Sequence, residues 1–98
     1  MKYSLTVRKE AELDISESFN FYEEHRLGLG HDFLLCVDAA ISKIERNPLL
    51  YKKIHKDLRR IAIERFPYRI FYLVKSQHIV ITAVFHVRKD PVSWEDRT

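Results

Sequence analysis

The second half of the chain carries a set of cationic side chains within apolar segments. These residues are Arg60, Arg65, Arg69, His86, Arg88 and Lys89. Guanidinium and ammonium groups bind phosphate and carboxylate oxygens, and a histidine can also transfer a proton near neutral pH. The chemistry offered by these residues is therefore recognition of an anionic partner, with proton transfer by His86 as the alternative.

The formal charge is distributed unevenly along the chain. Residues 1–50 contain six Lys and Arg and nine Asp and Glu, whereas residues 51–98 contain eleven and five. The first half therefore has a net charge of −3 and the second half one of +6. This segregation predicts a positive surface that attracts nucleic acid or an acidic protein segment.

The remaining histidines and the single cysteine do not indicate a metal or redox site. His25, His31, His55 and His78 lack the spacing of metal ligands, and no base lies near Cys36 in the sequence. We expect no metal, no cofactor and no intrachain disulfide. The N-terminus has no secretory pattern and no apolar run has the length of a membrane span, so we expect a cytoplasmic protein.

The first half of the sequence predicts one strand and two helices. Tyr3–Val7 alternates apolar and polar residues with the period of a strand, and from Glu10 the period becomes that of a helix. Gly28 and Gly30 predict a turn to a second, antiparallel helix, which is expected to end at Asn47-Pro48. The two apolar stripes comprise Ala11, Ile15, Phe19 and Tyr22 in the first helix, and Phe33, Val37, Ala40, Ile41 and Ile44 in the second.

The second half predicts three strands and a short helix. After a linking segment from Leu49 to Asp57, the patterns indicate strands at Arg59–Ile63, Tyr68–Lys75 and His78–Val87. Pro91 fits the first turn of a C-terminal helix. The fold class is α+β: an N-terminal strand, a helical hairpin, an antiparallel three-stranded meander and a short C-terminal helix, in a single domain over residues 1–98.

The helical hairpin is expected to cover one face of the sheet and to leave the other face partly open. We expect Arg60, Arg69, His86 and Arg88 to converge on that open face. Arg69 is expected either to reach an acidic target or to be held by Glu64 across the sheet. Such a surface would bind an anionic partner, but positive side chains also protect an exposed strand edge.

The aromatic residues are interpreted mainly as core. Tyr68, Phe71, Tyr72 and Phe85 lie in predicted strands of a small domain, whereas Trp94 lies beyond the last strand and either packs the C-terminal helix or caps an interface. A chain of 98 residues has a single core with little surplus stability. Complex formation or homodimerisation would therefore add to its stability.

Several short sequence motifs in these segments occur together in one protein family. They are Arg59-Arg60-Ile61, the run from Phe66 to Tyr72, the run from Ala83 to Asp90, and Trp94. With these motifs and this order of elements, the chain resembles the RelE/ParE superfamily of bacterial type II toxins over nearly its whole length. The resemblance implies one of two activities: RelE-like members cut messenger RNA on the ribosome, and ParE-like members inhibit DNA gyrase.

The residues of a RelE-like nuclease are only partly present. Arg69 falls on one of the family's catalytic arginines, but Asp90 and Trp94 fall on the second arginine and on the tyrosine near the C-terminus. The motif His86-x-x-Lys89-Asp90 is instead similar to the His-Gly-x-Arg-Asp motif of many ParE-like members, although Val87 replaces the glycine. The resemblance is therefore closer to the ParE branch.

This resemblance implies a plasmid-stabilising toxin that inhibits gyrase by binding, with no catalytic residue assigned, and forms a hetero-oligomer with a cognate antitoxin bearing an acidic amphipathic tail. Contacts with the antitoxin or target are expected from Arg60, Arg65, Arg69, His86, Arg88, Lys89 and Trp94. One alternative is a ribosome-dependent mRNA endonuclease in which His86 and Arg69 are catalytic, with Glu64 or Asp90 beside His86. A third is a non-toxic module that only binds the antitoxin.

Overall fold

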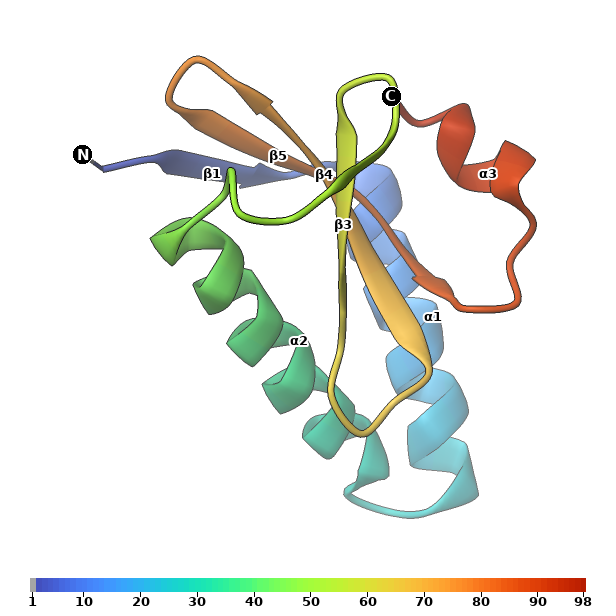
Figure 1. Cartoon of the computed structure of the whole chain (residues 1–98). Coiled ribbons are helices and arrows are strands. Elements are labelled where there is room, and N and C mark those ends of the chain that lie inside the picture. Colours follow the sequence, from blue (N-terminus) through green and yellow to red (C-terminus); the bar gives the residue numbers. More distant parts are fainter. Residues whose placement is uncertain (1) are drawn as a thin grey trace.

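The computed structural model describes residues 2–98, which form five strands and three helices (Figure 1). The strands are β1 (Ser4–Val7), β2 (Lys53–His55), β3 (Leu58–Ala62), β4 (Tyr68–Lys75) and β5 (His78–His86). The helices are α1 (Lys9–His25), α2 (Leu29–Arg46) and α3 (Pro91–Glu95). No helix in the described part of the chain is long and apolar enough to cross a lipid bilayer.

All five strands form one sheet in the order β1-β5-β4-β3-β2. β3, β4 and β5 are antiparallel neighbours, which confirms the predicted meander. β1 pairs in parallel with the first half of β5, from Ser4 opposite His78 to Val7 opposite Ile81. Within residues 2–98, the second half of β5 therefore has no strand on its outer side.

The two long helices pack on one face of the sheet and build the larger core with it (Figure 1). The hydroxyl of Tyr72, which is fully buried in this core, donates a hydrogen bond of 2.6 Å to the carbonyl of Pro48. Burial raises the pKa of Tyr72 to about 12. The buried residues of this core are Ala11, Phe33, Val37, Ala40, Ile44, Ile61, Ile63, Phe66, Tyr68, Ile70, Tyr72, Ile79, Ile81 and Val84.

A smaller core lies on the opposite face, where the alternate strand residues point. It contains Leu58, Phe71, Leu73, Ala83 and Phe85, with Ile54 and Trp94 packed against them. The rings of Trp94 and Phe71 are stacked, with centroids 5.2 Å apart and planes 19° apart. Trp94 thus packs α3 onto the sheet, and α3 covers part of the face that we expected to be open.

The turn between α1 and α2 depends on two glycines with different roles. Gly28 has a φ of +91°, the left-handed conformation expected at a helix turn. Gly30 lies inside α2, and a Cβ there would come within 2.7 Å of the carbonyl oxygen of Phe19. The prediction of a turn role for Gly30 is wrong, because its size is needed for close helix packing. The carboxylate of Glu23 accepts the N–H groups of both glycines, and these bonds lower the pKa of Glu23.

The predicted bounds differ from the structure mainly after α2. The segment from Leu49 to Asp57, expected to be a link, contains β2, which pairs with the beginning of β3. β2 has only three residues at the edge of the sheet, so no alternating pattern could reveal it. The predicted strand at Arg59–Ile63 begins and ends one residue earlier, as β3.

Candidate functional site

Arg60 and Arg69 lie together on the half of the sheet face that α3 leaves uncovered. Arg60 is opposite Phe71 and Arg69 is opposite Ala62, so both side chains are on one face of neighbouring strands. Burial, and next the charge of Arg69, lower the pKa of Arg60. Within residues 2–98, neither guanidinium forms an ion pair with a carboxylate. Two adjacent arginines without counter-charges favour an anionic ligand.

His86 lies on the other face of the sheet. It is opposite Tyr68, whose ring is in the larger core, and the two ring centroids are 5.3 Å apart. Its Nδ1 accepts the backbone N–H of Arg88 at 3.0 Å, which leaves Nε2 to carry the proton of the neutral ring. Phe85 is opposite Arg69 and shares its face of the sheet, and because consecutive strand residues point to alternate faces, His86 points to the other face. The prediction that His86 converges with Arg60 and Arg69 is therefore wrong.

Arg65 is also separate from the arginine pair. It lies in the turn between β3 and β4 with a φ of +72°, and its guanidinium is 3.6 Å from the carboxylate of Asp32 in α2. Glu64, in the same turn, pairs with Lys43 at 3.2 Å. The alternative in which Glu64 holds Arg69 is therefore wrong, and Arg69 remains available to a partner.

The residues after β5 have structural contacts. The Nζ of Lys89 lies 5.2 Å from the centre of the Phe85 ring. The Asp90 carboxylate caps α3, accepting the N–H and the hydroxyl of Ser93 at 3.2 and 3.1 Å. Trp94, as described, is stacked on the smaller core. Within residues 2–98, none of these three side chains forms a hydrogen bond or an ion pair with His86, so Asp90 is not its acid–base partner.

Asp14 and Arg97 form an ion pair that sequence reasoning missed. The Arg97 guanidinium donates to both Asp14 oxygens at 2.7 and 3.3 Å, and one of these oxygens also accepts the Val84 N–H at 3.0 Å. Burial raises the pKa of Asp14, although Arg97 and the Val84 N–H act in the opposite direction. The two charged residues are 83 positions apart, so no local spacing could predict their contact.

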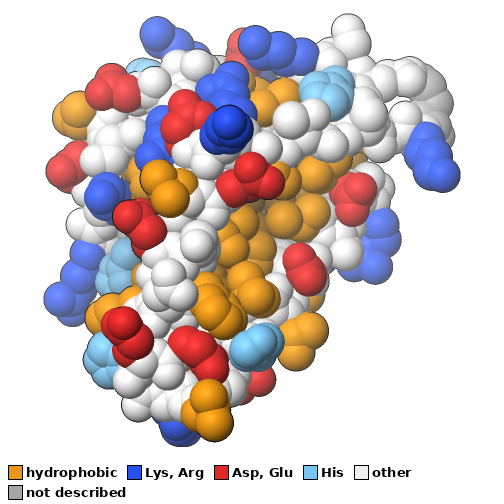
Figure 2. Space-filling view, turned by 180° about the vertical axis from the view of Figure 1, so that it is seen from behind, with side chains coloured by type: hydrophobic (Ala, Val, Ile, Leu, Met, Phe, Trp, Pro, Cys, Tyr) orange, Lys and Arg blue, Asp and Glu red, His pale blue; other side chains and the backbone are white. Residues whose placement is uncertain are grey.

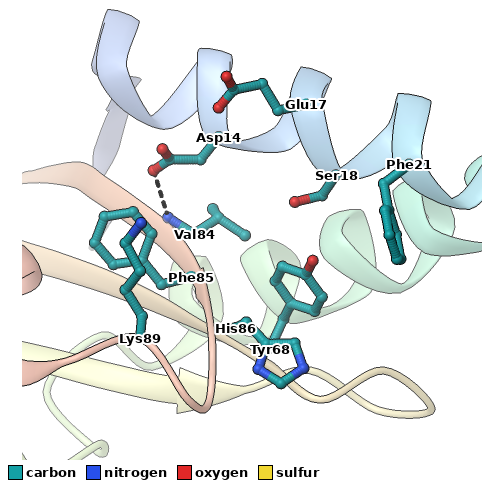
Figure 3. A pocket seen from close by; sticks show the side chains of 9 residues that line it. All are labelled: Asp14, Glu17, Ser18, Phe21, Tyr68, Val84, Phe85, His86 and Lys89. Carbon is teal, nitrogen blue, oxygen red and sulfur yellow. Dashed lines mark hydrogen bonds between the residues drawn. The ribbon is translucent and has the colours of Figure 1, made fainter.

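A polar trough runs along α1 beside the free part of β5 (Figure 3). One cavity of about 270 Å³ is lined by Asp14, Glu17, Ser18, Phe21, Tyr68, Val84, Phe85, His86 and Lys89. A second cavity of about 390 Å³ is lined by Glu10, Leu13, Asp14, Glu17, Phe85, Lys89, Ser93 and Arg97. The two cavities share four residues and so form one surface, the α1–β5 trough. Figure 3 shows Phe21 extending from α1 toward the sheet that carries Tyr68 and His86.

An apolar groove separates α1 from α2. Figure 2 shows apolar side chains along this groove, with acidic side chains on both sides. The cavity of about 290 Å³ is lined by Val7, Glu12, Ile15, Leu34, Val37, Asp38 and Ile41. This surface offers an apolar floor to a partner, whereas the face with Arg60 and Arg69 offers positive charge.

The sequence matches the family described as the ParE toxin of the type II toxin–antitoxin system, parDE, over residues 5–91. The chain belongs to this ParE toxin family. Toxin ParE2 of Mycobacterium tuberculosis is 28% identical over 96 residues, which are 97% of this chain and 91% of that relative. A ParE toxin of a type II system has a cognate antitoxin as its partner.

Solved structures agree with this ParE assignment at the level of the fold. A chain of the chromosomal ParDE system from P. aeruginosa superposes with a TM-score of 0.78 at 15% identity, covering 87% of this chain and 96% of that one. The toxin–antitoxin complex RelBE2 from Mycobacterium tuberculosis gives 0.61 at 18% identity, covering 88% and 99%. A mutant of E. coli toxin RelE in the free state gives 0.63 at 14% identity, covering 97% and 94%. The fold is thus common to ParE and RelE proteins and does not distinguish their activities.

Proposed function

We propose that this ParE-family toxin inhibits DNA gyrase by binding it and is neutralised by an antitoxin with an acidic amphipathic tail. The observation that carries the proposal is that Arg60 and Arg69 lie on one face of neighbouring strands with no carboxylate partner within residues 2–98. Their strand neighbours on the same face are Ala62, Phe71 and Phe85, none of which can accept or donate a proton. RNA cleavage requires an acid and a base beside the phosphate, whereas binding requires only the charge.

The acidic part of the antitoxin tail would bind at this arginine couple. Charge-assisted bonds from guanidinium to carboxylate are strong and directional, and both arginines are only partly exposed. The apolar part of the tail would fill a groove such as the one between α1 and α2. Because the contact at the arginines is electrostatic, the affinity should fall as the salt concentration rises.

The target is tested with two assays on the purified toxin. Gyrase supercoiling and DNA cleavage are measured in one, and messenger RNA integrity in a reconstituted translation reaction in the other. The proposal expects inhibition of gyrase and intact message. Ribosome-dependent cuts in the message with unaffected gyrase would replace it with the RelE-like activity, and binding of antitoxin without any growth arrest would replace it with the non-toxic module.

The arginine couple is tested separately by charge reversal. We expect Arg60→Glu and Arg69→Glu each to weaken antitoxin binding roughly tenfold or more, and to reduce its dependence on salt. Arg46→Glu makes the same change on an exposed position of α2 and should leave the affinity within about twofold. Equal effects of all three substitutions would mean that only the net charge matters, and would contradict a specific site.

A RelE-like nuclease remains the second candidate because of the position of His86. This ring borders the α1–β5 trough with Ser18, Tyr68 and Lys89, which together include hydroxyl and ammonium groups. The nuclease reading expects His86→Ala to abolish both mRNA cleavage and toxicity in a folded protein. In the gyrase reading, the same variant keeps its toxicity.

A further inference from the structure

The free edge of β5 beside α1 has an unused backbone donor. The Val87 N–H bonds to the Pro67 carbonyl at 2.8 Å, so in the antiparallel ladder the N–H groups of Val84 and His86 point to the outer edge of β5. Asp14 accepts the N–H of Val84. Because β1 ends opposite Ile81, no strand lies beside His86 on this outer edge, and its N–H has no acceptor within residues 2–98. Arg97 donates to the Thr82 carbonyl, and the Lys89 N–H bonds to the His86 carbonyl. An added extended segment can therefore pair with this edge through the His86 N–H.

The walls of the α1–β5 trough carry opposite charges. On α1, Glu10 and Glu17 are exposed and form no ion pair within the described residues. On the other side, Lys89 lies over the ring of Phe85, which belongs to the smaller core on the opposite sheet face. An extended segment at the edge of β5 would direct alternate side chains toward these two walls. Its complementary sequence would be basic toward α1 and acidic toward Lys89.

Two exposed apolar side chains on α1 flank the central glutamate. Leu13 is 60% exposed and Phe21 is 52% exposed, and each lines one of the two joined cavities. Because Leu13, Glu17 and Phe21 are four residues apart on α1, they follow one another at about 6 Å along the helix axis. Alternate residues of an extended strand are separated by about 6.6 Å. A strand can therefore place three successive same-side residues opposite these three positions.

We propose that the α1–β5 trough binds an extended segment of a partner protein. The side chains of this segment that face α1 are apolar, basic and apolar in turn, and the intervening side chains are acidic. The outer apolar side chains contact Phe21 and Leu13, the basic one contacts Glu17, and the acidic ones face Lys89. The backbone accepts the His86 N–H. The site does not include Arg60 or Arg69, although Phe85, which lines the trough, is the strand neighbour of Arg69, and the proposal does not depend on the identity of the toxin's target.

The probe is a nine-residue peptide with the central sequence Leu-Glu-Lys-Glu-Leu, compared with the charge-reversed Leu-Lys-Glu-Lys-Leu. Binding to the full-length toxin is measured by NMR titration, and the hydrogen exchange of the His86 amide is followed with and without peptide. We expect the first peptide to bind roughly tenfold more tightly than the reversed one and to slow exchange at His86. Equal affinities, no binding, or unchanged exchange at His86 would overturn the proposal.

Charge-swap variants separate recognition from general attraction. Glu17→Lys should weaken the first peptide roughly tenfold, whereas Glu24→Lys, an exposed position elsewhere on α1, should change the affinity less than about twofold. The double variant Glu17→Lys/Lys89→Glu should invert the preference and bind the reversed peptide. The double variant can show this inverted preference only if it is folded. If NMR confirms its fold and the preference is not inverted, the assignment of the two walls is wrong.

Discussion

Asp14→Ala should destabilise the fold by about 3 kcal/mol. The substitution removes the acceptor of two hydrogen bonds from Arg97 and of one from the Val84 N–H. The Asp14 side chain is 10% exposed and that of Arg97 is 23% exposed, so water replaces these bonds incompletely. A buried N–H without acceptor costs about 1–3 kcal/mol, and a charged hydrogen bond contributes about 1.5–3 kcal/mol. The Arg97 side chain is partly exposed and can turn toward water, which places the sum near the lower limits.

Urea unfolding followed by circular dichroism measures this loss. For a domain of this size, about 3 kcal/mol corresponds to a decrease in Tm of roughly 12–24 °C. The double variant Asp14→Ala/Arg97→Met should cost less than the sum of the two single changes, because no uncompensated charge remains beside Phe85. A loss below about 0.5 kcal/mol for Asp14→Ala, or strict additivity in the double variant, would refute the reasoning.

The pH dependence of the Asp14 contribution has a definite sign. Burial raises the pKa of Asp14 in the folded protein above its unfolded value of about 3.9. The stability from this shift is fully present below the unfolded pKa and is lost as the pH rises through the folded pKa. The unfolding free energy of the wild type minus that of Asp14→Asn should therefore be larger near pH 3 than at pH 7. The opposite trend would mean that Arg97 outweighs burial.

Three further substitutions test the packing. Gly30→Ala should destabilise by about 2 kcal/mol or more in thermal unfolding, because its Cβ would meet the backbone of α1 at 2.7 Å; a neutral result would show that the helices can separate. Tyr72→Phe should cost about 1–2 kcal/mol through loss of the bond to Pro48, and it should remove the part of the alkaline destabilisation that begins near pH 10 and extends toward the Tyr72 pKa of about 12. Trp94→Ala should cost about 3 kcal/mol by uncovering Phe71, as measured by urea unfolding, whereas a change below about 1 kcal/mol would indicate that α3 is not held by this stack.

The sequence was sufficient for seven of the eight elements of residues 2–98, all except β2, but not for the faces of the sheet. The break at Phe66-Pro67 and the turn at Ser76-Gln77 located β4 at the observed residues, and a proline located the first turn of α3, because these signals are local. Assigning His86 and Arg69 to opposite faces required the register between β4 and β5. In that register Tyr68 is opposite His86, and a β-bulge shifts the pairing between Phe71 and Tyr72. The residue pattern of a single strand does not reveal such a shift.

The candidate site was predictable only where its residues act alone. Arg60 and Arg69 were recognised because a charge inside an apolar strand is unusual, and the structure leaves both without a carboxylate in residues 2–98. The α1–β5 trough was missed, since Glu17 has the appearance of an ordinary solvated helix residue. The trough becomes a candidate binding site because β1 ends at Val7 and leaves the remaining edge of β5 without a neighbouring strand in residues 2–98.

Two positions after β5 bear on the choice between the RelE-like and the ParE-like activity. By resemblance, the positions of Asp90 and Trp94 would hold an arginine and a tyrosine in a RelE-like nuclease. Here Asp90 caps α3 and Trp94 stacks on Phe71, so both side chains hold the C-terminal helix against the sheet. Restoring the two nuclease side chains would remove the cap and the stack together. We therefore expect Asp90→Arg/Trp94→Tyr to loosen α3, measured as faster amide exchange in residues 91–95, before it creates any cleavage of RNA.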